Sequence, residues 1–241
     1  MRLICGDALR EMQRMDDGVF DAILTDPPYA SGAMTKSGRE QATSRKYTAG
    51  KGRCPYPDFA GDQMDQRSWG HFLRDVLREG LRVCKPGAVC VLTIDWRQLP
   101  ALTDALQQAG WIWRGTAVWD KVNSRPQKGR FRQQAEFLVW GSKGALPLDR
   151  PVPVLPGVFA AAVEAKGRQH QTQKPLALMR ELVKICVPGG RVLDPFAGSG
   201  TTLVAAREQG LDAVGIESVP DRKSTRMNSS HVKRERMPTS D

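Results

Sequence analysis

The sequence of 241 residues has no apolar run approaching the ~18 residues that a membrane-spanning helix needs, so we expect no membrane partner. Its start, MRLICGDALREM, lacks the pattern of a secretory signal peptide. The five cysteines are odd in number and never form C-x-x-C, which is typical of a reducing compartment and indicates the cytoplasm. The three histidines show no ligand spacing, and we therefore expect no metal site.

Acidic residues are outnumbered, since 36 Lys and Arg face 26 Asp and Glu and give a formal charge of +10. This balance favours a polyanionic partner, but it does not separate nucleic acid from a membrane surface or from simple solubility. The hydrophobic share of 40% and the charged share of 26% are ordinary for a folded protein, which excludes a disordered or fibrous chain.

The last residues of the chain differ in character from the rest. Residues 221–241 lack apolar periodicity and carry six Lys and Arg against three Asp and Glu, which is typical of a disordered tail that touches nucleic acid. A sharper hypothesis is that residues 221–231 are the in-frame translation of a sequencing adapter, with Met227 where Leu is expected. We therefore expect one domain over residues 1–220 and a tail that is not native.

Strand and helix signals alternate along residues 1–220. Short apolar or β-branched runs predict seven strands, at Arg2–Cys5, Val19–Thr25, Ala88–Ile94, Trp111–Trp119, Ala135–Gly141, Arg191–Asp194 and Asp212–Glu217. Apolar residues at helical spacing predict four helices, over residues 69–81, 99–109, 178–186 and 201–209. The alternation predicts an α/β fold with a mostly parallel sheet covered on both faces, whose ligands lie at the carboxyl ends of the strands.

Two segments interrupt this alternation. Residues 31–68 are rich in Gly, Ser, Lys and Arg, and an irregular stretch of that length is usually functional or mobile. Residues 145–171 are rich in Pro and Gly and form an irregular insertion, too short for a domain of its own, that is a candidate for target recognition.

A glycine turn follows the predicted strand at 191–194. Glycines let backbone N–H groups approach a ligand, and the acid that ends the next strand, Glu217, can accept both hydroxyls of a ribose. NAD and ATP fit poorly, because the third dinucleotide glycine and the P-loop lysine are missing. A tight connection without a ligand is an equally good explanation of such a turn. The residues that we assign to this cofactor loop are Asp194, Phe196, Ala197, Gly198, Ser199, Gly200, Thr201 and Thr202.

A second motif, Asp26-Pro27-Pro28-Tyr29, ends a predicted buried strand. The Asp26 carboxylate and the Pro27 carbonyl can together accept the two hydrogens of an amino group, and Tyr29 offers a face for stacking a base. Taken alone, Asp-Pro-Pro is more often a simple turn. A third motif, HQTQKP at residues 170–175, is by itself only a polar segment before a helix.

Together the three motifs resemble those of the amino-directed DNA methyltransferases, which methylate exocyclic nitrogens of adenine or cytosine. DPFAGSGTT resembles that family's cofactor loop, TDPPY its catalytic motif and HQTQKP its HPTQKP element, with Gln171 in place of the usual Pro. The order of the motifs resembles the circularly permuted subgroup, and the middle of the chain resembles compact phage and prophage enzymes. The resemblance implies a class I, Rossmann-like methyltransferase fold with seven strands, and S-adenosyl-L-methionine as cofactor.

The resemblance also implies roles for single residues. The glycine turn would contact the methionine part of the cofactor, Glu217 its ribose and Asp7 its adenine, while Thr172 and Lys174 would close the methionine pocket. Hydrogen bonds from the target amine to Asp26 and Pro27 would free the nitrogen lone pair for attack on the methyl group. In the family, Asp before Pro-Pro goes mostly with adenine, which favours adenine in double-stranded DNA over cytosine.

Two basic segments are candidates for DNA contact, although a solvated surface is the alternative for each. The basic loop 120–134 carries Lys121, Arg125, Lys128, Arg130 and Arg132, and the segment 31–68 carries Lys36, Arg39, Arg45 and Lys46. The alternatives are an N4-cytosine enzyme, an RNA or protein-amide methyltransferase, and a DNA-binding relative impaired in catalysis. For a DNA methyltransferase, a homodimer is a candidate assembly and restriction-modification a candidate role.

Overall fold

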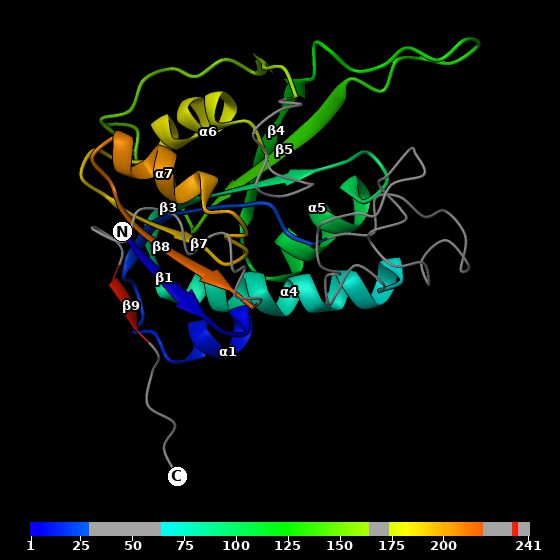
Figure 1. Cartoon of the computed structure of the whole chain (residues 1–241). Coiled ribbons are helices and arrows are strands. Elements are labelled where there is room, and N and C mark those ends of the chain that lie inside the picture. The colour runs from blue at the N-terminus through cyan, green and yellow to red at the C-terminus, as the bar shows by residue number, and fades with distance from the viewer. Residues whose placement is uncertain (29–63, 164–173, 219–232, 236–241) are drawn as a thin grey trace.

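The computed structural model describes residues 1–28, 64–163, 174–218 and 233–235 of the chain. One sheet of nine strands runs through the molecule in the order β6-β4-β5-β3-β2-β7-β8-β1-β9 (Figure 1). The strands are β1 (Arg2–Cys5), β2 (Phe20–Thr25), β3 (Cys84–Ile94), β4 (Ile112–Asp120), β5 (Ala135–Ser142), β6 (Val158–Ala160), β7 (Arg191–Asp194), β8 (Asp212–Glu217) and β9 (Lys233–Glu235).

The sheet is mostly parallel. β5 runs antiparallel to both of its neighbours, β3 and β4, and every other pair of adjacent strands is parallel. All seven predicted strands are present and the predicted α/β class is confirmed. The predicted strand number is wrong, because β6 and β9 extend the sheet at its two edges. Both are three residues long, too short for an alternating pattern to be visible in the sequence.

These two edge strands change the interpretation of two segments. β6 lies within residues 145–171, so that insertion is not wholly irregular. β9 lies within the tail and pairs in parallel with β1, with Arg2 opposite Lys233. For the other residues of the tail, which lie outside the described part of the chain, the expectation of disorder stays a prediction. The structure describes no packed helix there, and the adapter hypothesis stays a prediction, as does circular permutation.

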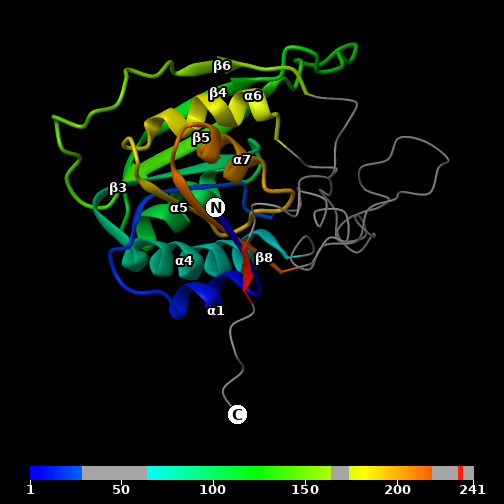
Figure 2. The ribbon, with the colours of Figure 1, turned by 60° about the vertical axis from the view of Figure 1, so that its left-hand side comes forward.

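Helices cover both faces of the sheet, as predicted (Figure 2). On one face lie α1 (Ala8–Gln13), α4 (Gln66–Val83) and α5 (Leu99–Gln108); on the other lie α6 (Leu176–Leu182), the 3-10 turn Val183–Ile185 and α7 (Thr201–Glu208). Strand β2 shows why two cores form. Ile23 packs into the first core, whereas Ala22 and Leu24 point to the second, because successive strand residues face opposite sides.

Helix α4 shows how the sequence specifies its elements. Asp65 caps the helix by accepting hydrogen bonds from the backbone N–H groups of Arg67 (3.0 Å) and Ser68 (3.1 Å). The stripe that includes Trp69 and Leu73 is buried against the sheet, and full burial of such side chains contributes about 1.5–3 kcal/mol each. By contrast α1 was not predicted, because six residues are too few to show a periodic stripe.

The strands β2 and β7 are neighbours, and the chain leaves them in opposite directions. From β2 the chain continues to β3 on one side, and from β7 it continues to β8 on the other. The hydroxyl of Thr25, at the end of β2, donates to Asp194 Oδ1, at the end of β7, over 2.6 Å. In open α/β sheets ligands bind at such a switch point, at the carboxyl ends of the strands, and both motifs lie there. Within the described part of the chain, no helix is long and apolar enough to cross a membrane.

Candidate active site

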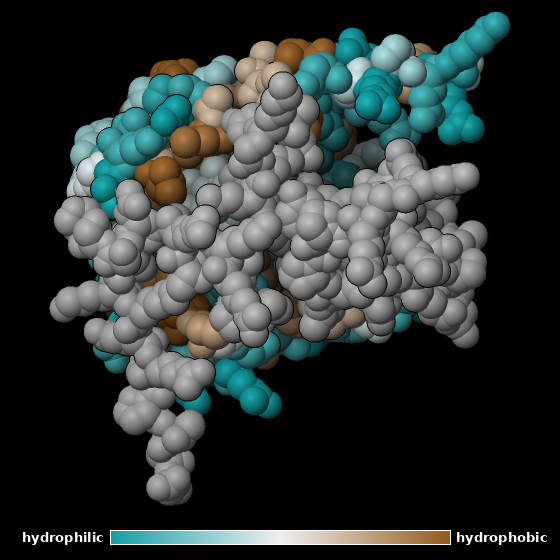
Figure 3. Space-filling view, in the orientation of Figure 1, coloured by the Kyte–Doolittle hydropathy of each residue, from teal (hydrophilic) through white to brown (hydrophobic). Residues whose placement is uncertain are grey.

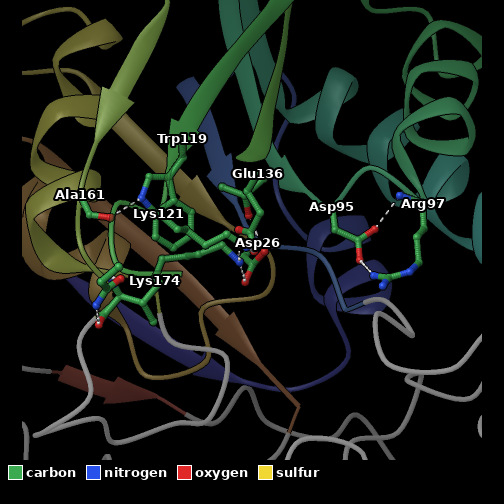
Figure 4. Close-up of polar contacts among 11 residues, drawn as sticks. Asp26, Asp95, Arg97, Trp119, Lys121, Glu136, Ala161 and Lys174 are labelled. Atoms are coloured by element: carbon green, nitrogen blue, oxygen red, sulfur yellow. Dashed lines mark hydrogen bonds and ion pairs between the residues drawn. The ribbon is translucent and has the colours of Figure 1, made fainter. Parts of the chain in front are cut away.

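Asp26 directly follows β2, and both of its carboxylate oxygens are hydrogen-bonded. The hydroxyl of Thr93, on the neighbouring strand β3, donates to Oδ1. The ammonium group of Lys174 lies 2.8 Å from Oδ2. The Asp26 side chain is 26% exposed, so it stays reachable from solvent. Figure 4 shows Lys174 reaching Asp26 beside Glu136 and Lys121.

Lys174 connects Asp26 to a second carboxylate. Its Nζ lies 3.4 Å from Glu136 Oε2, and Glu136 Oε1 lies 3.2 Å from Lys121 Nζ. The four side chains therefore alternate in charge from the base of the loop after β4 to the end of β2. The Lys121 ammonium group also lies 5.7 Å from the centre of the Trp119 ring.

The pKa values of the two carboxyl groups, Asp26 and Glu136, shift in opposite directions. Burial raises the pKa of Asp26, although the charge of Lys174 and hydrogen bonds from Lys174 and Thr93 lower it in part. Burial also acts to raise the pKa of Glu136, but the charges of Lys174 and Lys121 outweigh burial, and the pKa falls below its usual value. Lys174 thus stabilises the ionised form of both neighbours.

The Asp-Pro-Pro turn is fixed by α4. The indole N–H of Trp69 donates to the carbonyl of Pro28, and Trp69 is itself buried. The two prolines fix φ, so this bond holds the turn that carries Asp26 in one place. Tyr29, which completes the motif, lies outside the described residues.

The glycine turn lies at the next strand end. Gly198 (φ +49°) and Gly200 (φ +78°) adopt left-handed backbone conformations that side chains rarely tolerate. The backbone N–H of Gly198 donates to Glu217 Oε2 over 2.9 Å, which joins the turn to the acid that ends β8. Ser199 Oγ and Thr201 Oγ1 lie 3.1 Å apart at the start of α7.

Three predicted cofactor residues have side chains inside the protein. Asp194 is 2% exposed, and besides Thr25 it accepts a hydrogen bond from the Phe196 backbone N–H over 3.1 Å. Burial raises the pKa of Asp194 to about 6, against hydrogen bonds from Thr25 and Thr202 that lower it. Ala197 and Thr202 are also buried. These side chains brace the turn from within.

Phe196 and Asp7 lie at the borders of this region. The Phe196 ring is 6.0 Å from the ring of Phe72 on α4, measured between centroids. Asp7 is exposed and caps α1 by accepting from the Arg10 backbone N–H over 3.0 Å. The Gly6 N–H donates to the Glu217 carbonyl over 3.0 Å, so Asp7 follows a residue in contact with the predicted ribose-binding acid.

The basic loop after β4 carries two kinds of charged side chain, those with partners inside the protein and those that are exposed. Lys121 pairs with Glu136, and Arg132 donates to the carbonyls of Ser124 (2.8 Å) and Val122 (3.0 Å). The predicted phosphate contacts of these two residues stay predictions, with Lys121 held in an ion pair and Arg132 exposed. Arg125, Lys128 and Arg130 are exposed, in keeping with the prediction. Thr172, Lys36, Arg39, Arg45 and Lys46 lie outside the described residues.

Sequence reasoning missed four residues of the site: Thr93, Glu136, Trp69 and Phe72. For Glu136 a signal existed, since a half-buried charge inside an apolar strand needs a partner. Thr93, Trp69 and Phe72 look like ordinary core positions of a strand or a helix, and only the fold shows what they touch. The role of Lys174 in closing the methionine pocket stays a prediction, and the structure adds its contacts with Asp26 and Glu136.

Comparison with known proteins agrees with this geometry. The chain matches the family model N6_N4_Mtase, DNA methylase, over residues 20–153 and 155–226. It is 31% identical to YubD of Escherichia coli (strain K12) over 218 residues, covering 90% of this chain and 84% of YubD. It is 25% identical over 238 residues to the type II methyltransferase M2.DpnII of Streptococcus pneumoniae, covering 90% and 85%.

Two solved structures share the fold. TTHA0409 of Thermus thermophilus, complexed with S-adenosyl-L-methionine, superposes with a TM-score of 0.70 at 20% identity and covers 99% of both chains. The PvuII DNA methyltransferase, described as cytosine-N4-specific, has a TM-score of 0.67 at 15% identity, covering 90% of this chain and 82% of that one. The family match and the YubD identity confirm the resemblance: the chain belongs to the N6/N4 DNA methylase family, which takes its methyl group from S-adenosyl-L-methionine.

Proposed function

We propose that this chain transfers a methyl group from S-adenosyl-L-methionine to the exocyclic amino nitrogen of adenine in double-stranded DNA, at a specific sequence. One observation carries the proposal. Asp26 and the glycine turn end neighbouring strands, which are joined by the 2.6 Å hydrogen bond between Thr25 and Asp194. An acceptor for an amine and a loop suited to a cofactor therefore lie side by side at the carboxyl ends of the strands, where such sheets bind their ligands.

Asp26 acts as a hydrogen-bond acceptor in this mechanism. A carboxylate has about four acceptor positions. Thr93 and Lys174 each use one on a different oxygen, so acceptor capacity is left for an N–H of the target base. The Pro27 carbonyl takes the second N–H. Two such bonds favour a pyramidal nitrogen, whose lone pair is then no longer delocalised into the ring. Positioning and preorganised charge, with no covalent enzyme intermediate, lower the barrier.

The residues at the ends of β7 and β8 fit the cofactor. The left-handed glycines place no side chain over the turn, so a ligand can approach its backbone closely, and the half-buried Glu217 suits ribose hydroxyls. Phe196 offers an apolar surface for the methionine part. When bound, S-adenosyl-L-methionine supplies an electrophilic methyl group. Glu217 is already oriented by the Gly198 N–H, which preorganises this side of the site.

DNA must reach Asp26 with its target base out of the stack, because a paired amine is inaccessible within the duplex. Arg125, Lys128 and Arg130 are exposed on the loop after β4 and suit the phosphate backbone. Tyr29 is proposed as the stacking face. We place this activity in the cytoplasm of a bacterial or phage-infected cell, where its DNA substrate lies.

Cytosine is the second candidate substrate, because the N6/N4 family and the PvuII fold neighbour both include modification at cytosine N4. Both targets present an exocyclic amine, and Asp26 suits either. The preference for adenine rests on the family's use of Asp before Pro-Pro.

The test is transfer of tritiated methyl groups to unmethylated genomic DNA, followed by digestion and separation of the nucleosides. We expect the label in N6-methyladenine. Label in N4-methylcytosine would overturn the adenine assignment and support the second candidate. Cofactor and DNA both bound, with no label in either nucleoside, would refute the proposed activity and favour a DNA-binding relative.

A further inference from the structure

The loop between β4 and β5, residues 121–134, extends beyond the rest of the described chain (Figure 1). Since β3 and β4 both run antiparallel to β5, they are parallel to each other. The loop therefore leaves from the carboxyl ends of the parallel strands, where Asp26 also lies. The charged contacts from Lys121 through Glu136 and Lys174 to Asp26 connect the base of the loop to the candidate active site.

Contacts near its base hold this loop in one arrangement. Arg132 crosses from one arm to the other and donates to the carbonyls of Ser124 and Val122. Asn123 exchanges two hydrogen bonds with the backbone of Val163, at 2.9 and 2.8 Å. A loop fixed in this way loses less conformational entropy when it binds a partner.

Phe131 lies next to Arg132 in this loop and is 99% exposed. A phenyl ring is normally buried, and none of the described residues covers this one. The loop contains five Lys and Arg and no acidic residue, and the space-filling view shows its surroundings as strongly hydrophilic (Figure 3). An isolated aromatic ring among cations suits a partner that is polyanionic outside and apolar inside, which describes stacked DNA.

We propose that Phe131 is a wedge that enters the DNA base stack and fills the space left by the extruded target base. This inference rests on the proposed function. Arg125 and Lys128 would contact the flanking phosphates while the phenyl ring stacks on the neighbouring bases. Stacking of the phenyl ring on these bases then offsets the free-energy cost of taking the target base out of the duplex. This happens next to the carboxyl ends of the strands, where Asp26 lies.

The test compares binding to two short fluorescein-labelled duplexes at equal ionic strength, one intact and one with a central abasic site. A wedge enters the abasic duplex without unstacking a base, so the wild type should prefer it by about tenfold. Phe131→Ala should reduce this preference to less than about twofold. Ile112→Ala is the matched control: Ile112 is also an exposed apolar residue, 44% exposed, but it is the first residue of β4, whereas the loop follows the last residue of that strand.

Equal affinity of the wild type for both duplexes, or an unchanged preference in Phe131→Ala, would overturn the wedge. The same variants are then assayed for methyl transfer to intact DNA, where Phe131→Ala should be about tenfold slower and Ile112→Ala unchanged. If the wild type transfers no methyl group, the proposed function fails, while the binding comparison still decides whether Phe131 enters the stack. Phe131→Trp, which keeps an aromatic ring, should restore the preference for the abasic duplex.

Discussion

Replacing Asp194 by Asn changes how the stability of the protein depends on pH. Asp194 is buried, and burial raises its pKa to about 6 in the folded protein. The ordinary value, 3.8, applies to the unfolded chain. Because the folded state binds the proton more tightly, the contribution of Asp194 to stability is complete below about pH 4 and is lost as the pH rises through about 6.

The size of this effect follows from the two pKa values. Each pKa unit corresponds to about 1.36 kcal/mol, so the free energy of unfolding should lose about 2–2.5 kcal/mol between pH 4 and pH 7 through this one group. Asn keeps the shape of Asp194 and an oxygen that can accept from Thr25, but it does not titrate. The difference in unfolding free energy between Asp194→Asn and the wild type should therefore move by about 2–2.5 kcal/mol in favour of the variant over this pH range.

Urea denaturation of both proteins across this pH range measures the difference directly. Asp104→Asn, on the exposed side of α5, is the control and should run parallel to the wild type. A constant difference between Asp194→Asn and the wild type would refute the reasoning, because it would mean that the buried carboxylate titrates alike in the folded and unfolded chains.

Three further substitutions test other contacts of the site. Lys174→Met removes the cation that lowers the pKa of Asp26, so the acidic limb of the pH–rate profile should move to higher pH, whereas Lys184→Met, on the surface, should leave it in place. If the acidic limb of the profile of Lys174→Met stayed at the wild-type position, this would contradict the pairing of Lys174 with Asp26. Trp69→Phe removes the hydrogen bond to the Pro28 carbonyl and should cost about 1 kcal/mol in urea denaturation and lower kcat; wild-type values of both would show that the bond does not hold the turn. Gly215→Ala sets a Cβ 2.7 Å from Leu203 Cδ1 and 2.8 Å from Ala197 Cβ. It should lower the free energy of unfolding by about 1–3 kcal/mol and weaken cofactor binding. Gly157→Ala, where nothing lies within 4 Å of the added Cβ, is the control. Equal cofactor affinity in both glycine variants would argue against a role of this packing in the cofactor loop.

The fold was largely predictable because its signals are local. Each central strand is a short apolar run, and helices such as α4 bury a regular stripe, so burial and periodicity agree along the chain. The strands that escaped prediction, β6 and β9, are short and lie at the edges, where little apolar surface is buried. Helix α1 was not predicted because its six residues are too few to show a periodic stripe.

The site was predictable in its motifs but not in its contacts. Asp26, the glycine turn and Glu217 are next to one another because parallel strands end at one edge, which sequence order alone implies. Lys174 approaches Asp26 across 148 residues of sequence, and Thr93 approaches it across 67. No local pattern encodes such separations. For the same reason, sequence could not distinguish Lys121, which pairs with Glu136, from the exposed cations of its loop.

The central claim is that Asp26, held by Thr93 and Lys174, is the acceptor for the target amine. The most direct measurement is a single-turnover assay of methyl transfer with Asp26→Ala and the wild type, each saturated with tritiated S-adenosyl-L-methionine and with unmethylated DNA. We expect Asp26→Ala to bind the cofactor as the wild type does and to lose about 10²–10³-fold in the rate of transfer, the size found when one preorganised hydrogen-bonding group is removed from an active site. Transfer by Asp26→Ala at the wild-type rate would contradict the account.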